Sequence, residues 1–181
     1  GDISLDGSAQ EDDLIEAKRL HQVVDLPLRF IPGNHDIGES QDAPGHAGLP
    51  MLSDLTRERY LRHFGPAYWS LDVPGWRILA VNDFLLGSNL SAADAQIRFV
   101  REMAATAGSM PLALFMHRPL FLAAPDEQDI TARFINPLPR AQLLAALGAS
   151  GFPLVAALVH PRGMGMGDVK LALLLGAVLG R

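Results

Sequence analysis

A short apolar run bounded by two prolines, Leu28 to Ile31, leads directly into the segment Pro32-Gly33-Asn34-His35-Asp36. Such a run is typical of a buried β-strand, and the Pro and Gly residues after it predict a sharp loop. Asn, His and carboxylate side chains at a strand end can bind divalent metal ions or act as acid and base. The same residue types are also common in ordinary turns, so this segment alone leaves both interpretations open.

The rest of the pattern alternates helices with strands. Capping-box spacing at Ser8–Glu11 and at Ser91–Asp94 predicts the starts of two helices. Helices are expected over residues 9–24, 53–63, 91–104 and 140–147. Strands are expected over residues 28–31, 68–73, 76–82 and 112–116, with a hairpin around Pro74-Gly75. This order predicts a layered α/β domain.

The composition limits the classes of partner and cofactor. The 181 residues are 49% hydrophobic and 19% charged, which favours one folded domain over disorder. The net charge of -5 gives no general attraction to nucleic acid, so nucleic acid is not expected as a stable partner. Because the chain has no cysteine, a metal ion would be bound by His, Asp, Asn, Glu or Gln. That fits a cytoplasmic protein without excluding an exported one.

Both ends of the chain are unusual. The sequence opens at Gly1-Asp2 without an initiator Met, and we expect a cut edge there. From about Phe152 polar residues nearly vanish, and alternating Gly and Met over residues 163–167 leads into an apolar segment. We therefore predict a domain over residues 1–157 and an apolar tail over 158–181, through which any membrane contact would occur. The apolar stretch is about half of the roughly 20 residues that a spanning helix needs.

The order of the polar motifs favours the chemical interpretation of the loop. Gly1-Asp2, Gly33 to Asp36 and the lone His117 before Arg118-Pro119 follow one another as in the calcineurin-like metallophosphoesterases, which the chain resembles over about residues 1–155. The segment 64–70 and Gln96 resemble the middle of that family too. The resemblance implies an incomplete four-layer αββα sandwich. It also implies a metallophosphoesterase, a phosphatase or phosphodiesterase that hydrolyses a small phosphoester.

The resemblance also assigns roles to residues. It implies two divalent ions of Mn, Fe or Zn, with Asp2 bridging them and Asn34 and His117 as ligands of the second ion. His35 and Asp36 would be catalytic, with His35 oriented by Asp36 and either protonating the leaving group or stabilising the transition state. In a two-metal site the ions polarise the phosphoryl oxygen and activate water, so no Ser or Cys nucleophile is needed.

The chain departs from the family pattern at both ends. An Asp-x-His motif would precede Gly1, and in place of the later Gly-His-x-His stands Ala157-Leu158-Val159-His160, where only His160 could correspond. Most ligands of the first ion are therefore expected to be missing, and the fragment's activity to be impaired. One alternative is a non-catalytic metal-binding fragment of the same fold.

A second alternative is a chimera. Gly165-Met166-Gly167-Asp168 resembles the Gly-x-Gly-Asp segment of type IV prepilin peptidases, which are membrane aspartic proteases. Such an enzyme needs a second carboxylate to share the acid and base roles, and several spanning helices. We expect Asp168 to be a solvated carboxylate here. The other histidines, at positions 21, 46 and 63, are not expected to bind metal.

Overall fold

The computed structural model describes residues 1–43, 45, 48–148, 155–158 and 171–175, the last two ranges as backbone. The helices are α1 (Glu11–His21), α2 (Asn34–Ile37), α3 (Asp54–Phe64), α4 (Ser91–Ala105) and α5 (Pro137–Gly148). The strands are β1 (Trp69–Val73), β2 (Trp76–Ala80), β3 (Leu112–Phe115), β4 (Val155–Leu158) and β5 (Leu171–Leu175).

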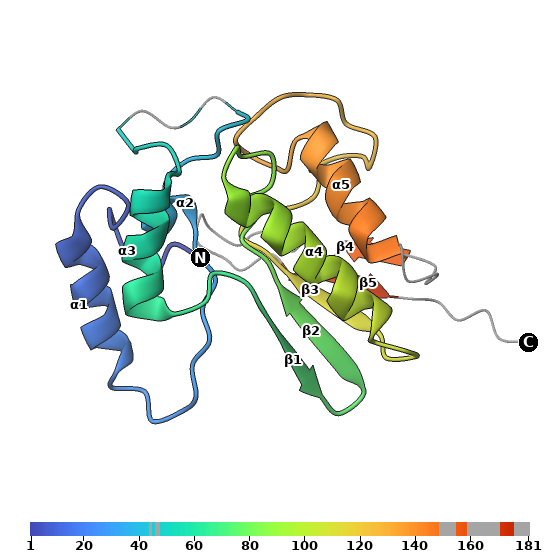
Figure 1. Ribbon diagram of the computed structural model, residues 1–181, viewed down its shortest axis with the longest axis horizontal. Helices are drawn as coiled ribbons and strands as arrows, with labels where there is room; N and C mark the ends of the chain where they lie inside the picture. The colour runs from blue at the N-terminus through green and yellow to red at the C-terminus, as the bar shows by residue number, and fades with distance from the viewer. Residues whose placement is uncertain (44, 46–47, 149–154, 159–170, 176–181) are drawn as a thin grey trace, which may run out of the picture.

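The strands form a mixed sheet in the order β1-β2-β3-β5-β4. β2 and β3 are parallel, whereas β1 with β2, β3 with β5 and β4 with β5 are antiparallel. α4 connects the two parallel strands, and α4 and α5 lie side by side across one face of the sheet (Figure 1). The protein is thus α/β, as predicted. The four-layer sandwich is not confirmed, because the described residues form a single sheet.

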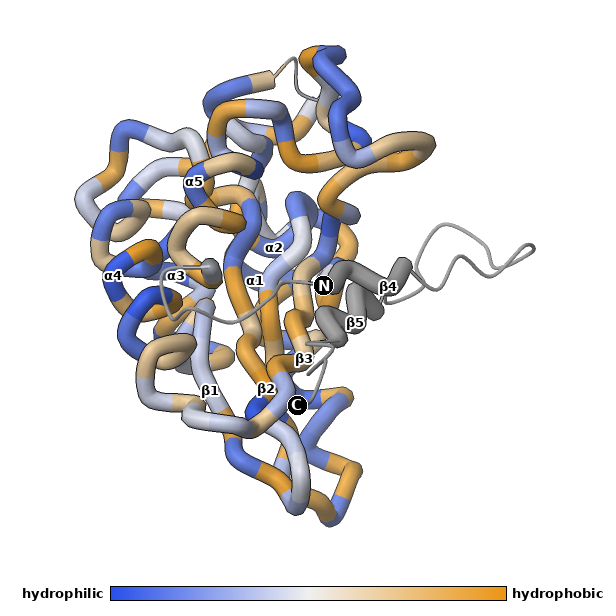
Figure 2. Tube along the Cα trace, turned by 90° about the vertical axis from the view of Figure 1, so that its right-hand side faces the viewer, coloured by the Kyte–Doolittle hydropathy of each residue, from blue (hydrophilic) through white to orange (hydrophobic). Residues whose placement is uncertain are grey.

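Two clusters of apolar side chains make the core. The larger lies between the sheet and its helices, and Figure 2 shows the hydrophobic colour running along β2 and β3. It includes Leu79, Val100, Leu114, Met116 and Leu143, all with at most 1% of their surface exposed. The smaller cluster packs α2 against α3 and the segment after β2, and it includes Ile37, Leu52, Tyr60, Phe84 and Leu85.

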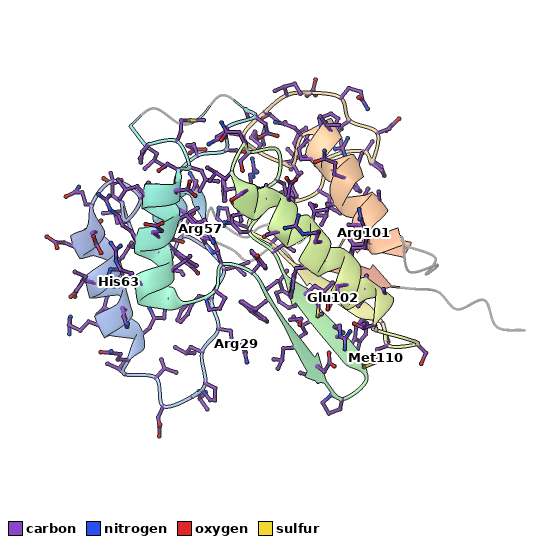
Figure 3. The ribbon with its side chains drawn as sticks, in the orientation of Figure 1. Arg29, Arg57, His63, Arg101, Glu102 and Met110 are labelled. Carbon is purple, nitrogen blue, oxygen red and sulfur yellow. The ribbon has the colours of Figure 1, made fainter. Side chains whose placement is uncertain are left out.

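α1 and α3 form a separate helical pair beside the sheet (Figure 1). His63 lies on the side of α3 that faces α1 (Figure 3), and its Nε2 is 2.9 Å from Glu11 Oε1. Arg62 donates to the same oxygen at 2.8 Å. These contacts join the first turn of α1 to the last turn of α3. His63 therefore takes part in a contact between two helices.

Local signals in the sequence predicted several elements well. Ser53 caps α3 by accepting a hydrogen bond from the Thr56 N–H at 3.2 Å, and Gly65 ends that helix with a φ of 76°. The hairpin of β1 and β2, the strand β3 and the helices α4 and α5 are also confirmed, with ends shifted by a few residues.

Three local expectations were wrong. Residues 28–31 are not a strand, because they have no ladder partner in the described part of the chain; the Phe30 carbonyl instead accepts the Trp69 indole N–H at 2.7 Å. Ser8 and Ser91 do not cap helices, since α1 follows Gln10 and α4 follows Leu90.

The tail enters the sheet through its backbone. β5 pairs with β3, so Ala113 lies opposite Leu173, and residues 171–175 of the predicted apolar tail form a strand of the sheet. Gly163 to Gly167, Asp168 and His160 lie outside the described residues. The division at residues 157 and 158 stays a prediction. Among the described helices none is long and apolar enough to cross a membrane.

Candidate metal and catalytic site

Three segments that are far apart in the sequence meet beside the sheet: the first residues of the chain, the motif at residues 33–36 and the loop after β3. Asp2 Oδ2 lies 3.4 Å from His117 Nε2. Asp2 Oδ1 accepts a long hydrogen bond of 3.4 Å from the backbone N–H of His35. The fold therefore brings two of the predicted metal ligands, Asp2 and His117, to one place.

Glycines make this close approach possible. A Cβ atom added to Gly33 would lie 2.0 Å from Asp2 Oδ1, and one added to Gly1 would lie 2.4 Å from His117 Nδ1. Asp2 itself has a φ of 53°, the left-handed conformation that non-glycine residues rarely adopt. Backbone strain of this kind concentrates at functional sites, where the surrounding structure enforces it.

Asp36 anchors the segment that carries Asp2. Its carboxylate is fully buried and accepts hydrogen bonds from the N–H groups of Ile3 at 3.0 Å, Ser4 at 2.8 Å and Gly33 at 2.8 Å. The Ser4 hydroxyl donates a fourth bond at 2.7 Å. The sequence predicted that Asp36 orients His35. The structure corrects this, because both oxygens of Asp36 bind the two backbone segments instead.

The ring of His35 is held by a different group. His35 Nδ1 is 2.6 Å from the Leu5 carbonyl oxygen, which can only accept, so Nδ1 carries a hydrogen and donates it. Nε2 is then the nitrogen left to exchange a proton. The side chain is half-buried.

Asn34 is oriented by a buried carboxylate. Its Nδ2 donates to Glu39 Oε1 at 2.7 Å, and both side chains are at least nine-tenths buried. Because the amide nitrogen is used in this bond, the amide oxygen is the atom left to bind a cation. Sequence analysis missed Glu39, which follows the motif in an irregular segment without a recognisable spacing.

A buried ion pair holds the loop after β3. Arg118 Nε donates to Asp83 Oδ2 at 2.7 Å, and Asp83 Oδ1 accepts the backbone N–H of His117 at 2.9 Å. Sequence analysis missed both charged residues. Two signals pointed to them: Asp83 directly follows a predicted strand that ends at Asn82, and Arg118 adjoins the lone histidine.

The residues present fit one divalent ion. Asp2, Asn34 and His117 offer a carboxylate, an amide oxygen and an imidazole nitrogen, a mixed donor set that suits Mn, Fe or Zn. In the described ranges no group of three or more His, Cys, Asp or Glu side chains could hold a metal. This finding concerns both expected ions, and His160 lies outside the described residues.

Two other histidines have partners elsewhere. His21 Nδ1 donates to the Ala17 carbonyl at 2.8 Å, and its ring packs edge-on against Phe30 at 5.0 Å between centroids. His63 binds Glu11, as described above. His46 lies outside the described residues.

Comparison with known proteins gives one informative match. The chain is 32% identical over 110 residues to the serine/threonine-protein phosphatase CPPED1 of Danio rerio, a match that covers 58% of this chain. The same match covers 32% of that phosphatase, so the chain spans about a third of the relative's length. No family model matches the sequence. The similarity supports a phosphoesterase relationship at the level of the family, and nothing found supports the prepilin peptidase resemblance of the tail.

Proposed function

We propose that the chain is part of a metal-dependent phosphoester hydrolase of the calcineurin-like metallophosphoesterase type. The observation that carries the proposal is the meeting of Asp2, the Gly33 to Asp36 motif and His117 at one point, from three separate segments. The similarity to a named phosphatase supports the same conclusion independently of this geometry.

Asp2, Asn34 and His117 would hold one divalent ion. When bound, such an ion supplies Lewis-acid polarisation of a phosphoryl oxygen. The protein's own contribution is to place the three donors. Asp36 fixes the segment of Asp2, Glu39 fixes the amide of Asn34, and Asp83 binds the backbone of His117.

His35 is proposed as the acid that protonates the leaving oxygen of the substrate. Its Nδ1 donates to the Leu5 carbonyl, which sets the ring orientation, so Nε2 can give up a proton when the ring is the imidazolium with a proton on each nitrogen. General acid catalysis of this kind typically contributes about 10² to 10⁴ in rate. A small phosphoester is the proposed substrate.

The remaining family features are proposed for the longer protein to which these residues would belong. They are a second divalent ion, for which Asp2 would be the bridging ligand, a complete four-layer αββα sandwich and a location in the cytoplasm. The alternative is a fragment that binds metal without catalysis. It is favoured by the sequence Ala157-Leu158-Val159-His160, which stands where the family's Gly-His-x-His motif is expected.

Two measurements test the proposal. Calorimetric titration with Mn²⁺ should show about one weakly bound ion, and His117→Ala should abolish this binding. His21→Ala is the matched control, because the His21 ring contacts the Ala17 carbonyl and Phe30 rather than a proposed ligand. Binding unchanged in His117→Ala would contradict the site.

A hydrolysis assay distinguishes the proposed enzyme from the non-catalytic metal-binding fragment. We expect Mn²⁺-dependent release of p-nitrophenol from p-nitrophenyl phosphate or from its bis-ester. Metal binding without turnover of either ester would support the non-catalytic alternative. Turnover that survives chelation of all metal would contradict both.

A further inference from the structure

The buried ion pair of Asp83 and Arg118 contacts the backbone of His117. Asp83 has 0% of its surface exposed and Arg118 has 5%. Besides the bond from Arg118 Nε, the Arg118 Nη2 donates to the Asp83 backbone carbonyl at 2.9 Å. The guanidinium also lies over the ring of Phe84, with Cζ 4.5 Å from the ring centroid. This network belongs to the segment after β2 and the loop after β3. Asp83 entered the proposed function only through its bond to the His117 backbone, and Arg118 has no role in it.

A contribution to stability does not explain why this ion pair is buried. Removing two charges from water costs free energy that their attraction only partly returns, and replacing a buried pair by apolar side chains is often neutral or stabilising. Here, in addition, Arg118 Nη1 is buried and finds no hydrogen-bond partner in the part of the chain that the structure describes. A pair that leaves a donor unsatisfied is not optimised for stability.

The Asp83 carboxylate does something that an apolar residue could not do. Oδ1 accepts the His117 N–H at 2.9 Å, while Oδ2 accepts the Arg118 N–H at 3.4 Å and the Arg118 Nε–H at 2.7 Å. The backbone N–H groups of His117 and Arg118 therefore both end on one carboxylate. Phe84 supports the ring as well, since its centroid is 5.7 Å from that of His117.

We infer that Asp83 is a positioning residue for metal binding: it fixes the backbone of His117, and Arg118 serves as its counter-ion. This inference rests on the proposed function, because it assigns a purpose to the geometry of a proposed ligand. Residues that hydrogen-bond to a metal ligand typically contribute about 10- to 100-fold in metal affinity.

The test compares three variants with the natural chain. Asp83→Asn places an amide N–H against Arg118 or against the His117 N–H, so one of these bonds is lost. We expect Mn²⁺ affinity, measured by calorimetry, to fall about 10- to 100-fold. In the double variant Asp83→Asn with Arg118→Met the competing guanidinium is gone, and the Asn oxygen can accept the His117 N–H. Most of the lost affinity should then return.

Leu143→Ala controls for stability. Leu143 is fully buried in α5, and its truncation destabilises the core without changing a group that binds His117. All variants are titrated at a temperature where circular dichroism shows them folded. Natural affinity in Asp83→Asn, or an equal loss in Leu143→Ala, would overturn the inference. A double variant as weak as the single one would assign the loss to the missing charge and would overturn it too.

Amide hydrogen exchange of His117 gives a readout that needs no metal. Asp83→Asn should speed its exchange about 10-fold, as expected for the loss of one hydrogen bond, and the double variant should slow it again. If the natural chain binds no Mn²⁺, the proposed function fails while this exchange still decides whether Asp83 fixes His117. Unchanged exchange would overturn the inference by itself.

Discussion

Two buried carboxylates, Asp36 and Asp83, organise the candidate site. An ionised carboxylate has about four acceptor positions and no donor, so it can gather several N–H groups from loops that lack ladder partners. Asp36 does this for the segment of Asp2, and Asp83 does it for the loop of His117. The chain thus binds each ligand-bearing loop from a segment that is more than thirty residues away in sequence.

The Asp36 carboxylate should matter for folding as well as for the site. In Asp36→Asn the amide nitrogen cannot accept, so two of the four donors that now bind Asp36 are left unsatisfied. We expect the free energy of unfolding, measured in urea, to fall by about 1–3 kcal/mol. Asp129→Asn, at an exposed loop position, should change it by no more than about 0.5 kcal/mol. Equal effects would show that Asp36 is not an anchor.

His35→Ala should separate catalysis from metal binding. The ring is held by Leu5 and is proposed as the proton donor, so its loss should lower turnover by about 10² to 10⁴ where turnover is measurable. Mn²⁺ content should stay nearly unchanged, because the proposed ligands are other residues. If Mn²⁺ affinity and turnover fall together, His35 is a ligand and its assignment as the acid is wrong.

At the scale of elements, the sequence correctly predicted the helices and strands that local residue signals determine. The hairpin of β1 and β2 follows from Pro74-Gly75 between two β-prone runs, and α3 follows from its Ser53 cap and Gly65 stop. The expected strand over residues 28–31 needed a pairing partner distant in sequence, which no local pattern reveals. The Ser8 cap failed for a similar reason, because the Ser8 N–H donates to the His35 carbonyl at 2.8 Å.

The same distinction applies to the candidate site. The motif order named Asp2, Asn34 and His117, and the fold brings Asp2 and His117 together. The partners that hold them depend on contacts between distant segments. The sequence therefore named Asp36 with the wrong partner and did not name Glu39 or Asp83.

The cap of α3 gives a prediction at this scale. Ser53 Oγ accepts the Thr56 N–H, and Thr56 Oγ1 accepts the Ser53 N–H at 3.0 Å, so each side chain satisfies a backbone donor of the other residue. Ser53→Ala should lower the free energy of unfolding by about 1 kcal/mol, and Ser53→Gly by only a few tenths, in urea denaturation. A loss as large in the Gly variant would point to a cause other than capping.

At the scale of the whole molecule, the candidate site lies where two halves of the chain meet. Residues 1–65 supply the motif and the helical pair, and residues 69–148 supply β1, β2 and β3 with α4 and α5 (Figure 1). Hydrogen bonds from Trp69 to the Phe30 carbonyl and from Asn136 to the Asp42 carbonyl, at 2.7 and 2.9 Å, join these halves. The geometry of the site therefore depends on the complete fold rather than on one loop.

The pH dependence of folding stability involves groups in several parts of the molecule. Hydrogen bonds from Arg62 and His63 lower the pKa of Glu11, and a hydrogen bond from Arg77 lowers the pKa of Asp72. A lowered pKa in the folded state contributes stability above the unfolded pKa, and this is lost as the pH falls through the folded pKa. Both groups are exposed, so they make only a modest contribution to acid unfolding.

Burial of Tyr60 should lower the stability of the fold at alkaline pH. Burial, reinforced by the negative charge of Asp36, raises the pKa of Tyr60 far above its usual value near 10. The folded protein then keeps a proton that the unfolded chain loses above about pH 10, so its stability falls as the pH rises, by up to about 1.4 kcal/mol per pH unit. In Tyr60→Phe this part of the fall should disappear when the free energy of unfolding is compared in urea at pH 8 and pH 11.

Tyr60→Phe should change the free energy of unfolding little at neutral pH. The Tyr60 hydroxyl is buried and has no hydrogen-bond partner among the residues that the structure describes, so its removal leaves no donor or acceptor newly unsatisfied. The stacked contact of the ring with Phe64, at 5.5 Å between centroids, is available to phenylalanine as well. Tyr68→Phe, at the chain's other tyrosine, is the control for losing a phenol. If the alkaline fall is the same in Tyr60→Phe as in the natural chain, or if Tyr68→Phe removes it equally, burial of Tyr60 is not its cause.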